Sequence, residues 1–553
     1  MTPPVAPAPA RRRRLPGALG ALLLFAVLAV LHTWPLASAP ARLSRNDNAD
    51  TVLNTWAIAW VAHALVHTPR HLLDGNIFHP ERHTLAFSEP VIVPGVLSVP
   101  VRALGASPVL SYNLSLLLGY VLSAWAMQWL AWRWTGNYAA SLVAGALFAF
   151  NAHTLTRMGH IQAIHAYGLP LLLLALDDLL RPDGRRLAQG VLLGLAVATL
   201  ALTSGYLTIF GIVCGLVTVL VRPRDLVRGS TRRMVRAGLM AALVGGVLIA
   251  PVLQGYLAVR REHGFARSLG EVAAMSANGA AYLATPARIH AGWAGDVYAR
   301  RQPHDSLFPG VVAVLLAVAG VALWRDRWRD PRLRTAVVIA LAGAVLSFGP
   351  ATPFYPVFHA TVPFAGGIRA ASRFGMLWLT GLSLLAAYGL AAAAGRWPWA
   401  GRRLAVAALI VVTAESFRGP VPYVSAVEPS PVYTTLAALP DGVVAEMPFW
   451  WAPLDLPRNA PYMLASTRHW KPLLNGYSGF TPASYRRHAD VLWYFPNWPS
   501  SFAELERAGV RYVVVHLDQY GSSRADALAL IRASRALRLV AAVDQVHLYE
   551  LVR

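Results

Sequence analysis

Two aspartates, Asp47 and Asp50, follow the first long apolar segment of the chain, in the stretch "SRNDNADTVLNTWAIAW". A carboxylate at a membrane surface, partly shielded from water, could take a proton from a hydroxyl group. Asp50 is the first candidate for such a general base, and Asp47 is the second. The structural alternative is that Asp50 caps the helix that follows, since an aspartate oxygen accepts the free amide hydrogens of a first helical turn.

Tryptophans and histidines recur at steps of three and four directly after these aspartates. Trp56, Trp60, His63 and His67 therefore share one face of a predicted helix. Indoles along one face are typical of a helix that lies in the membrane interface. His63, His67 and His71 also have the spacing of metal ligands, but no HExxH pattern accompanies them, so the interfacial face is the favoured interpretation.

Two groups of basic side chains could hold a phosphate. His153, Arg157 and His160 stand at steps of four and three in "NAHTLTRMGHIQ", so they face one way if one helix continues through them. Arg369 and Arg373 lie one turn apart in "GGIRAASRF", at the start of a later apolar segment. Guanidinium and imidazole groups at this depth suit a lipid phosphate. The alternative is a set of basic helix ends that contact lipid headgroups.

Other polar and aromatic residues could bind a sugar or an acceptor. Glu89 precedes a proline in an extended loop and could be a second acid near the site, or a solvated loop carboxylate. Trp470, Lys471 and Tyr477 lie in a stretch rich in glycine and aromatic residues close to the C-terminal end. Flat rings and hydrogen-bonding loops suit sugar faces, although they equally suit packing of one part of the protein against another.

The composition indicates a membrane protein that must hold these residues at its surface. Of the 553 residues, 56% are hydrophobic and 14% are charged. The formal charge of +22 lies almost entirely on arginine, and Lys471 is the only lysine. The basic residues fall between apolar segments and do not form one polar surface, so the pattern argues against a nucleic-acid partner. The single cysteine carries no information about disulfides.

About eleven apolar segments could cross a hydrocarbon core of roughly 20 residues. Every second connection between them is rich in arginine, as in "RPDGRR" and "RDRWRDPRLR". The positive-inside rule then predicts a cytoplasmic N-terminus and a C-terminal region outside. A cleaved signal peptide is the alternative for the first segment. The predicted spans are Leu15–Leu36, Val109–Leu130, Ala139–Ala152, Ile161–Leu180, Leu187–Leu202, Tyr206–Val221, Val235–Leu257, Leu307–Trp324, Ala336–Phe348, Phe374–Ala394 and Leu404–Phe417.

Three regions follow from this pattern. Residues 1–14 are a disordered, basic, cytoplasmic N-terminus. Residues 15–418 are the all-α polytopic membrane domain, whose first outer loop covers residues 38–101. Residues 419–553 are a small extracytoplasmic α/β domain. Its predicted strands are Asp441–Phe449, Arg511–Asp518 and Leu539–Val552, and its predicted helices are Ser501–Ala508 and Ser523–Ser534.

An acid just after the first span, a neighbouring interfacial helix, about eleven spans, outward-facing arginines and an α/β tail together resemble the GT-C superfamily of membrane glycosyltransferases. The stretches "NTWAIAWVAHAL", "NIFHPERHTLAFSE" and "NGYSGFTPASY" also resemble a bacterial branch near the YfhO-type membrane proteins. The best-known GT-C members carry adjacent acids where this chain has Ala49 and Asp50.

The resemblance implies an inverting transfer of sugar from a polyprenyl-phosphate donor to a glycan, lipid or protein acceptor of the cell envelope. The reaction would occur on the outer side of a bacterial cytoplasmic membrane. Asp50 would be the general base, and the candidates for the lipid phosphate would be Arg157, His160, Arg369 and Arg373. A transporter or flippase of lipid-linked sugars and a non-catalytic envelope-assembly protein are the alternatives. The residues predict no metal site and identify neither the sugar, the acceptor nor a requirement for a divalent metal.

Overall fold

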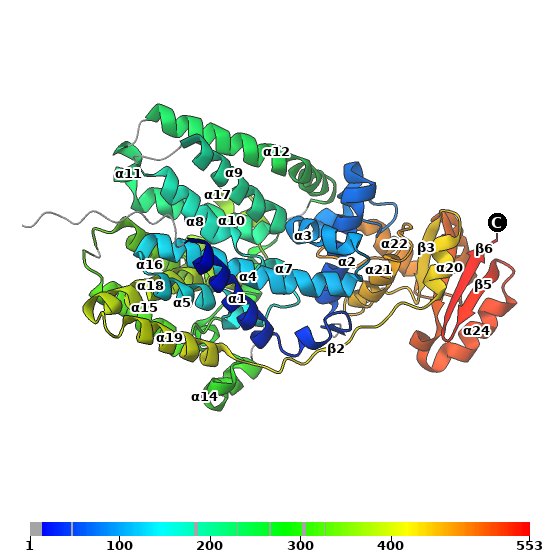
Figure 1. The fold of residues 1–553 in the computed structure, drawn as a ribbon. Coiled ribbons are helices and arrows are strands. Elements are labelled where there is room, and N and C mark those ends of the chain that lie inside the picture. The colour runs from blue at the N-terminus through cyan, green and yellow to red at the C-terminus, as the bar shows by residue number, and fades with distance from the viewer. Residues whose placement is uncertain are drawn as a thin grey trace, which may run out of the picture.

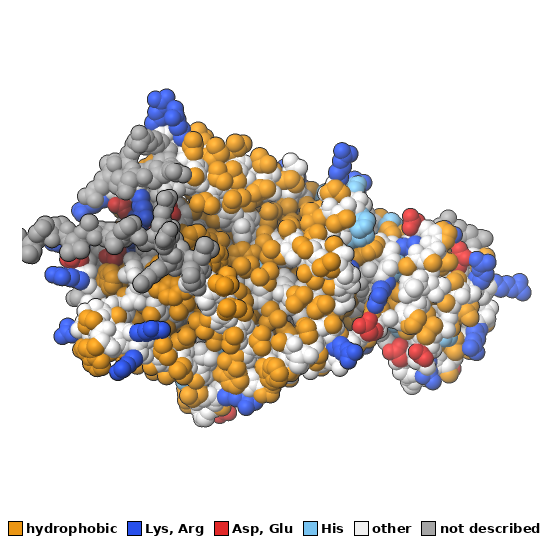
Figure 2. Space-filling view, viewed as in Figure 1, with side chains coloured by type: hydrophobic (Ala, Val, Ile, Leu, Met, Phe, Trp, Pro, Cys, Tyr) orange, Lys and Arg blue, Asp and Glu red, His pale blue; other side chains and the backbone are white. Residues whose placement is uncertain are grey.

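The computed structural model describes residues 14–45, 48–181, 186–228, 231–264, 267–300, 306–326 and 328–552. The predicted disordered segment 1–14 therefore lies almost wholly outside the described residues. The described chain forms a large helical bundle with a smaller α/β tail at one end (Figure 1). On the face shown in Figure 2, apolar side chains cover most of the bundle, whereas lysine and arginine gather toward its two ends and on the tail.

Each predicted span contains a helix of the bundle. By length and composition, four helical segments of the described chain could cross a membrane: Pro108–Thr135, Tyr138–Leu155, Met234–His263 and Ala371–Arg396. The number of eleven crossings therefore stays a prediction. The bundle helices are α1 (Arg14–His32), α4 (Pro108–Thr135), α5 (Tyr138–Ala149), α8 (Gly168–Leu179), α9 (Arg186–Thr203), α10 (Gly205–Val221), α12 (Thr231–His263), α15 (Val311–Leu323), α16 (Pro331–Ser347), α18 (Gly375–Arg396) and α19 (Gly401–Ser416).

The predicted span Ile161–Leu180 is wrong as a single helix. The chain forms a short helix α7 (Ile161–Ile164), breaks, and resumes in α8 at Gly168. The remaining short helices at the edges of the bundle are α6 (Ala152–Leu155), α11 (Pro223–Arg228), α13 (Leu269–Ala274), α14 (Ala291–Ala299) and α17 (Phe354–Thr361). The break between α6 and α7 leaves the segment around His160 free to turn toward the tail end of the bundle.

Helices α2 (Ala49–His67) and α3 (Ile92–Ala103) form a layer between the bundle and the tail (Figure 1). The prediction that the indole face of α2 lies along the lipid interface is wrong. Trp56 is 1% exposed and Trp60 is 6% exposed, because α2 packs against α3, α4 and the tail helix α21 (Ala460–Ser466). Its apolar and aromatic residues form a protein interior, so α2 connects the bundle to the tail.

The tail is built on a four-stranded sheet of order β3-β4-β6-β5. Strands β3 (Val443–Met447) and β4 (Val510–His516) lie where the first two strands were predicted, and they pair in parallel. The third predicted strand is instead a hairpin of β5 (Leu537–Val543) and β6 (Val546–Leu551), which turns at Asp544, a residue with φ of +53°. The other tail helices are α20 (Val432–Ala438), α22 (Ala483–Leu492), α23 (Pro499–Arg507) and α24 (Arg524–Ala533). A two-residue pairing of β1 (Leu43–Ser44) with β2 (Val424–Ser425) joins the first loop to the start of the tail.

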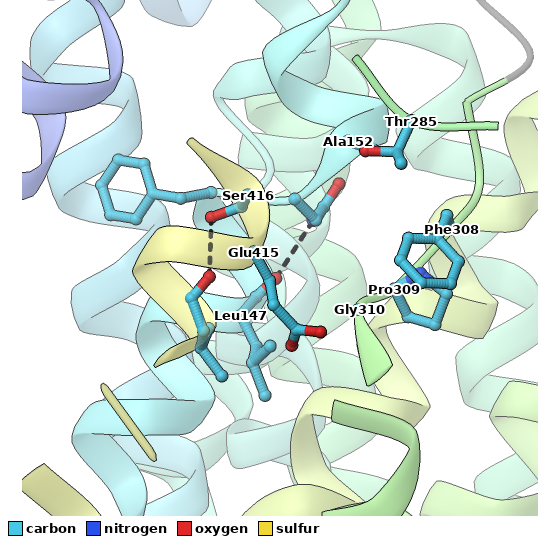
Figure 3. A pocket seen from close by; sticks show the side chains of 11 residues that line it. Leu147, Ala152, Thr285, Phe308, Pro309, Gly310, Glu415 and Ser416 are labelled. Carbon is cyan, nitrogen blue, oxygen red and sulfur yellow. Dashed lines mark hydrogen bonds between the residues drawn. The ribbon is translucent and has the colours of Figure 1, made fainter. Parts of the chain in front are cut away.

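At the end of the bundle near the tail, a buried glutamate joins two helices. Gly310, which precedes α15, has no side chain to cap that helix and adopts a φ of +97°. Glu415 of α19 supplies the acceptor: its two oxygens accept the amide hydrogens of Val311 and Val312 at 2.8 and 3.0 Å. In Figure 3 this carboxylate points toward the segment that precedes α15, across a small pocket.

Replacing Glu415 with alanine should therefore destabilise the bundle. The amides of Val311 and Val312 would lose their acceptors, at a cost of about 1–3 kcal/mol in the free energy of unfolding. Thermal unfolding of the detergent-purified protein should show a lower midpoint for Glu415→Ala. Glu506→Ala, which removes an exposed glutamate on α23, is the matched control and should leave the midpoint unchanged. Equal midpoints for the two variants would contradict the capping role.

Candidate active site

Asp50 does not cap helix α2. The residue at the cap is Asn48, whose backbone is extended and whose side-chain oxygen accepts the Asp50 amide hydrogen at 2.9 Å. Because Asn48 satisfies the helix end, the Asp50 carboxylate is available for other partners. The capping interpretation of Asp50 is therefore wrong. Asp47, the second candidate base, lies outside the described residues.

The Asp50 carboxylate is held from two sides. The Tyr477 hydroxyl donates to Oδ1 at 2.9 Å, and His160 Nε2 lies 3.2 Å from Oδ2. Burial alone would raise the pKa of Asp50, but the hydrogen bond and charge of His160, the Tyr477 hydrogen bond and the charge of Arg373 lower it to about 2. Asp50 is therefore ionised throughout the physiological pH range while it remains 37% exposed.

His160 reaches Asp50 from the break in the bundle helices. The expectation that one helix continues through His153, Arg157 and His160 is wrong, since α6 ends at Leu155 and His160 immediately precedes α7. Burial lowers the pKa of His160, the charges of Arg373 and Arg157 lower it further, and contact with Asp50 opposes them. The imidazole is therefore neutral at neutral pH, and its charge acts on Asp50 only at the acidic pH at which the ring is protonated. An ionised carboxylate only accepts, so Nε2 carries the proton that points at Asp50.

A second carboxylate, Glu89, approaches the same site from the loop before α3. Its Oε2 accepts the amide hydrogen of Gly205, the first residue of α10, at 3.1 Å. Burial raises the pKa of Glu89, although hydrogen bonds from Ser204 and Gly205 and the charge of Arg373 oppose this shift. The two carboxyl groups that share Arg373 thus have pKa values shifted in opposite directions, a pattern typical of groups with different roles in proton transfer.

Tyr206 contacts both of the predicted arginines before α18. The Arg373 guanidinium lies 4.3 Å from the ring centroid of Tyr206 in α10. The Tyr206 hydroxyl accepts the backbone amide hydrogens of Arg369 and Ala370 at 3.1 and 2.9 Å. Arg369 is exposed at this site. Tyr206 was not among the predicted site residues; the available signal is Ser204, a typical cap residue that directly precedes α10.

Hydrogen bonds between the first loop and the tail position the segment that carries Tyr477. Asn76 is the centre of this contact: its amide donates to the Ser466 hydroxyl and the Lys471 carbonyl at 3.1 Å, and its oxygen accepts from Trp56 Nε1 at 3.0 Å. The Leu473 amide donates to the Asn76 carbonyl at 2.9 Å. This loop-to-tail contact fixes the segment that carries Tyr477.

Three of the predicted site residues have other surroundings. Trp470 stacks on His63 of α2, with ring centroids 4.1 Å apart. Lys471 is 5% exposed, and its Nζ donates to the Leu439 carbonyl at 2.8 Å, within the tail. His153 is 2% exposed within α6. Arg157 is also 2% exposed, but its charge acts on His160, so it lies beside the site.

The histidines with metal-like spacing contact other partners. The rings of His63 and His67 stack on each other with centroids 4.4 Å apart, and His71 Nδ1 lies 3.0 Å from Asp74. Within the described ranges of the chain, no group of three or more histidine, cysteine, aspartate or glutamate side chains could hold a metal ion.

The site therefore combines an ionised carboxylate, a neutral imidazole, a carboxyl group with a raised pKa and fixed guanidinium groups at the junction of bundle and tail. The carboxylate can accept a proton from a hydroxyl, and the guanidinium groups can stabilise an anionic leaving group.

Solved structures share this architecture. The arabinofuranosyltransferase AftD from mycobacteria superposes with a TM-score of 0.62 over 99% of this chain and 40% of its own, at 16% sequence identity. This chain has the GT-C fold. It spans about two fifths of the length of AftD.

Two other solved structures align less closely. They are the oligosaccharyltransferase AglB from Archaeoglobus fulgidus (TM-score 0.46, 13% identity, 92% of this chain and 70% of its own) and ArnT from Cupriavidus metallidurans (TM-score 0.41, 13% identity, 97% and 98%). Likenesses at this level do not inform the site. No family model matches the chain, and no curated protein matches it. The narrower resemblance to YfhO-type proteins stays a prediction.

Asn76→Ala should loosen the segment that carries Tyr477. The variant would leave the Trp56 indole N–H and the Lys471 carbonyl without partners, at a cost of about 1–3 kcal/mol for each buried group. Hydrogen exchange of residues 473–477 should become faster, while exchange in α4 stays as in the wild type. Asn497→Ala, at an exposed asparagine of the tail, is the control. Unchanged exchange in Asn76→Ala would show that the loop-to-tail contact does not hold this segment.

Proposed function

We propose that this chain is a membrane glycosyltransferase that moves a sugar from a polyprenyl-phosphate donor to an acceptor of the bacterial cell envelope. The observation that carries the proposal is the Asp50 carboxylate, which is ionised, is not used as a helix cap and lies beside Arg373. The GT-C fold supports a sugar transfer. With eleven spans and a cytoplasmic N-terminus, the site faces the outside of the cytoplasmic membrane.

In the proposed reaction the acceptor hydroxyl attacks the anomeric carbon while Asp50 takes the hydroxyl proton. The bond between the anomeric carbon and the phosphate oxygen breaks, and its electron pair leaves with the polyprenyl phosphate. Arg373 and Arg369, with Arg157 beside His160, stabilise the negative charge that develops there. Attack from the face opposite the phosphate inverts the anomeric centre. His160 donates to the second Asp50 oxygen and so keeps the first oxygen aimed at the acceptor.

The Tyr477 hydroxyl and Glu89 have different roles in this scheme. Tyr477 donates to the Asp50 oxygen that would receive the proton, so its hydroxyl occupies the position that an acceptor hydroxyl must take. The acceptor therefore replaces Tyr477 on binding. Glu89, with its raised pKa, can hold a proton and donate a hydrogen bond to a sugar hydroxyl. Trp470 and Lys471 have no part in this scheme because they contact His63 and Leu439.

Asp50→Asn should abolish most of the transfer. An amide keeps the shape of the carboxylate but cannot take a proton, so the rate should fall by about 10²–10⁴-fold, the usual contribution of a general base. The measurement is transfer of radiolabelled sugar from polyprenyl-phosphate donors to endogenous acceptors in membranes with matched amounts of protein. Asp526→Asn, at an exposed position of α24, is the charge-matched control. Equal transfer by the wild type and Asp50→Asn would exclude Asp50 as the base.

His160→Gln should change the pH dependence of transfer. In the wild type the pKa of Asp50 is lowered to about 2, so the carboxylate stays ionised as the pH falls toward 4. Without the His160 hydrogen bond and charge, the pKa of Asp50 rises, and the carboxylate takes up protons at a higher pH. The acid limb of kcat/KM should therefore move to higher pH in the variant. An acid limb at the wild-type position, or at lower pH, would contradict the proposed contact.

A further inference from the structure

A second group of cationic and aromatic side chains lies at the opposite end of α2 from Asp50. We call it the junction patch: His63 and His67 of α2, Arg102 of α3, and Arg468 and Trp470 of the tail. Three separate parts of the chain thus meet in one place, which the proposed reaction does not use.

A stack of rings forms the centre of the junction patch. The His63 ring lies between His67, at 4.4 Å and an interplanar angle of 21°, and Trp470, at 4.1 Å and 12°. His67 Nδ1 lies 3.0 Å from the His63 carbonyl, which fixes the second ring on the first. The patch is therefore a preformed surface.

Two guanidinium groups adjoin this stack with little negative charge to balance them. Burial lowers the pKa of Arg102, and the charge of Arg468, which lies two residues before Trp470 in the chain, lowers it further. Arg468 pairs at 3.2 Å with Glu428, a side chain that is 75% exposed. The ion pairs found in the described part of the chain include none for Arg102, whose Nη1 donates to the Ala106 carbonyl. Like charges brought together in this way favour the binding of an anion.

Exposed apolar side chains border the junction patch. Leu104, two residues after Arg102, is 89% exposed, Val66, beside His67, is 61% exposed, and Val96 of α3 is 47% exposed. In Figure 2 histidine atoms lie where the apolar surface of the bundle meets the tail. Such a border of apolar and cationic side chains is typical of the level of lipid headgroups.

The junction patch lies far from Asp50 and therefore from the proposed active site. At 1.5 Å per residue, the helix between Asp50 and His63 or His67 extends about 20–25 Å. The phosphate of a donor undergoing transfer must lie next to the sugar carbon that reacts near Asp50. The junction patch therefore suits a different phosphate.

We propose that the junction patch binds the headgroup phosphate of an anionic phospholipid in the membrane leaflet nearest the tail. Arg102 and Arg468 contact the phosphate oxygens, and the acyl chains lie along Val66, Val96 and Leu104. Because the binding residues come from α2, α3 and the tail, a bound lipid would link the tail to the membrane domain.

The test is lipid binding by the whole purified chain, measured by native mass spectrometry. The delipidated protein is titrated with phosphatidylglycerol, with phosphatidylcholine of the same acyl chains, and with undecaprenyl phosphate. The variants are Arg102→Gln/Arg468→Gln and the single variant Arg468→Gln, whose side chain is half exposed and should leave folding intact. Arg260→Gln/Arg261→Gln removes two exposed arginines at the end of α12 and is the control.

The wild type should prefer phosphatidylglycerol to phosphatidylcholine. Each basic side chain near an anionic lipid adds about a fivefold preference, so the single variant should lose about fivefold and the double variant about 25-fold. The control should bind as the wild type does. Equal binding of the two phospholipids, an equal loss in the control, or a larger loss of undecaprenyl phosphate than of phosphatidylglycerol binding in the double variant would overturn the proposal. Since no transfer is measured, the result is independent of the proposed glycosyltransferase activity.

Discussion

The cap at the start of α2 decides what Asp50 can do. Had the Asp50 carboxylate accepted the free amides of the first turn, its oxygens would be occupied by backbone groups, as they are in an ordinary helix cap. Asn48 takes that place instead, so the carboxylate faces His160 and Tyr477. Because the neutral side chain of Asn48 caps the helix, Asp50 is a candidate base and not a structural cap. Arg373, Glu89 and the tail segment can act together with this carboxylate only because it does not cap the helix.

Arg373 acts on both carboxyl groups of the site. Its charge favours the ionised form of both Asp50 and Glu89, yet their pKa values move in opposite directions. The difference comes from the other partners. Asp50 has a hydrogen bond to each oxygen from a side chain and remains partly exposed, whereas burial dominates at Glu89. One cation can thus lie beside two carboxyl groups whose pKa values are shifted in opposite directions, because the other surroundings of each group differ.

Much of this arrangement could be predicted from the sequence, but not its details. Residue type and predicted depth in the membrane indicated Asp50, His160, Arg369 and Arg373 as site candidates, and the α/β tail followed from its strand pattern. Helical periodicity placed the indoles of α2 on one face but could not show that this face packs on the tail, because that depends on contacts far apart in the chain. Trp470 and Lys471 were selected by composition alone. Their neighbours His63 and Leu439 lie 407 and 32 residues away in the chain, and spacing carries no information about such pairs.

Besides Asn76, a second asparagine joins the tail to the site. Asn475 is bonded to the backbone of Glu446 in β3, accepting its amide hydrogen at 2.8 Å and donating to its carbonyl at 3.0 Å. Its own carbonyl accepts the amide hydrogen of Phe78 in the first loop at 3.0 Å. Tyr477 follows two residues later. The sheet, the first loop and Asp50 are therefore joined through three consecutive residues, so that a movement of the tail sheet would also move the hydroxyl that donates to Asp50. A soluble domain tethered by a flexible linker could not position Tyr477 in this way, and in this geometry access to Asp50 depends on where the tail lies.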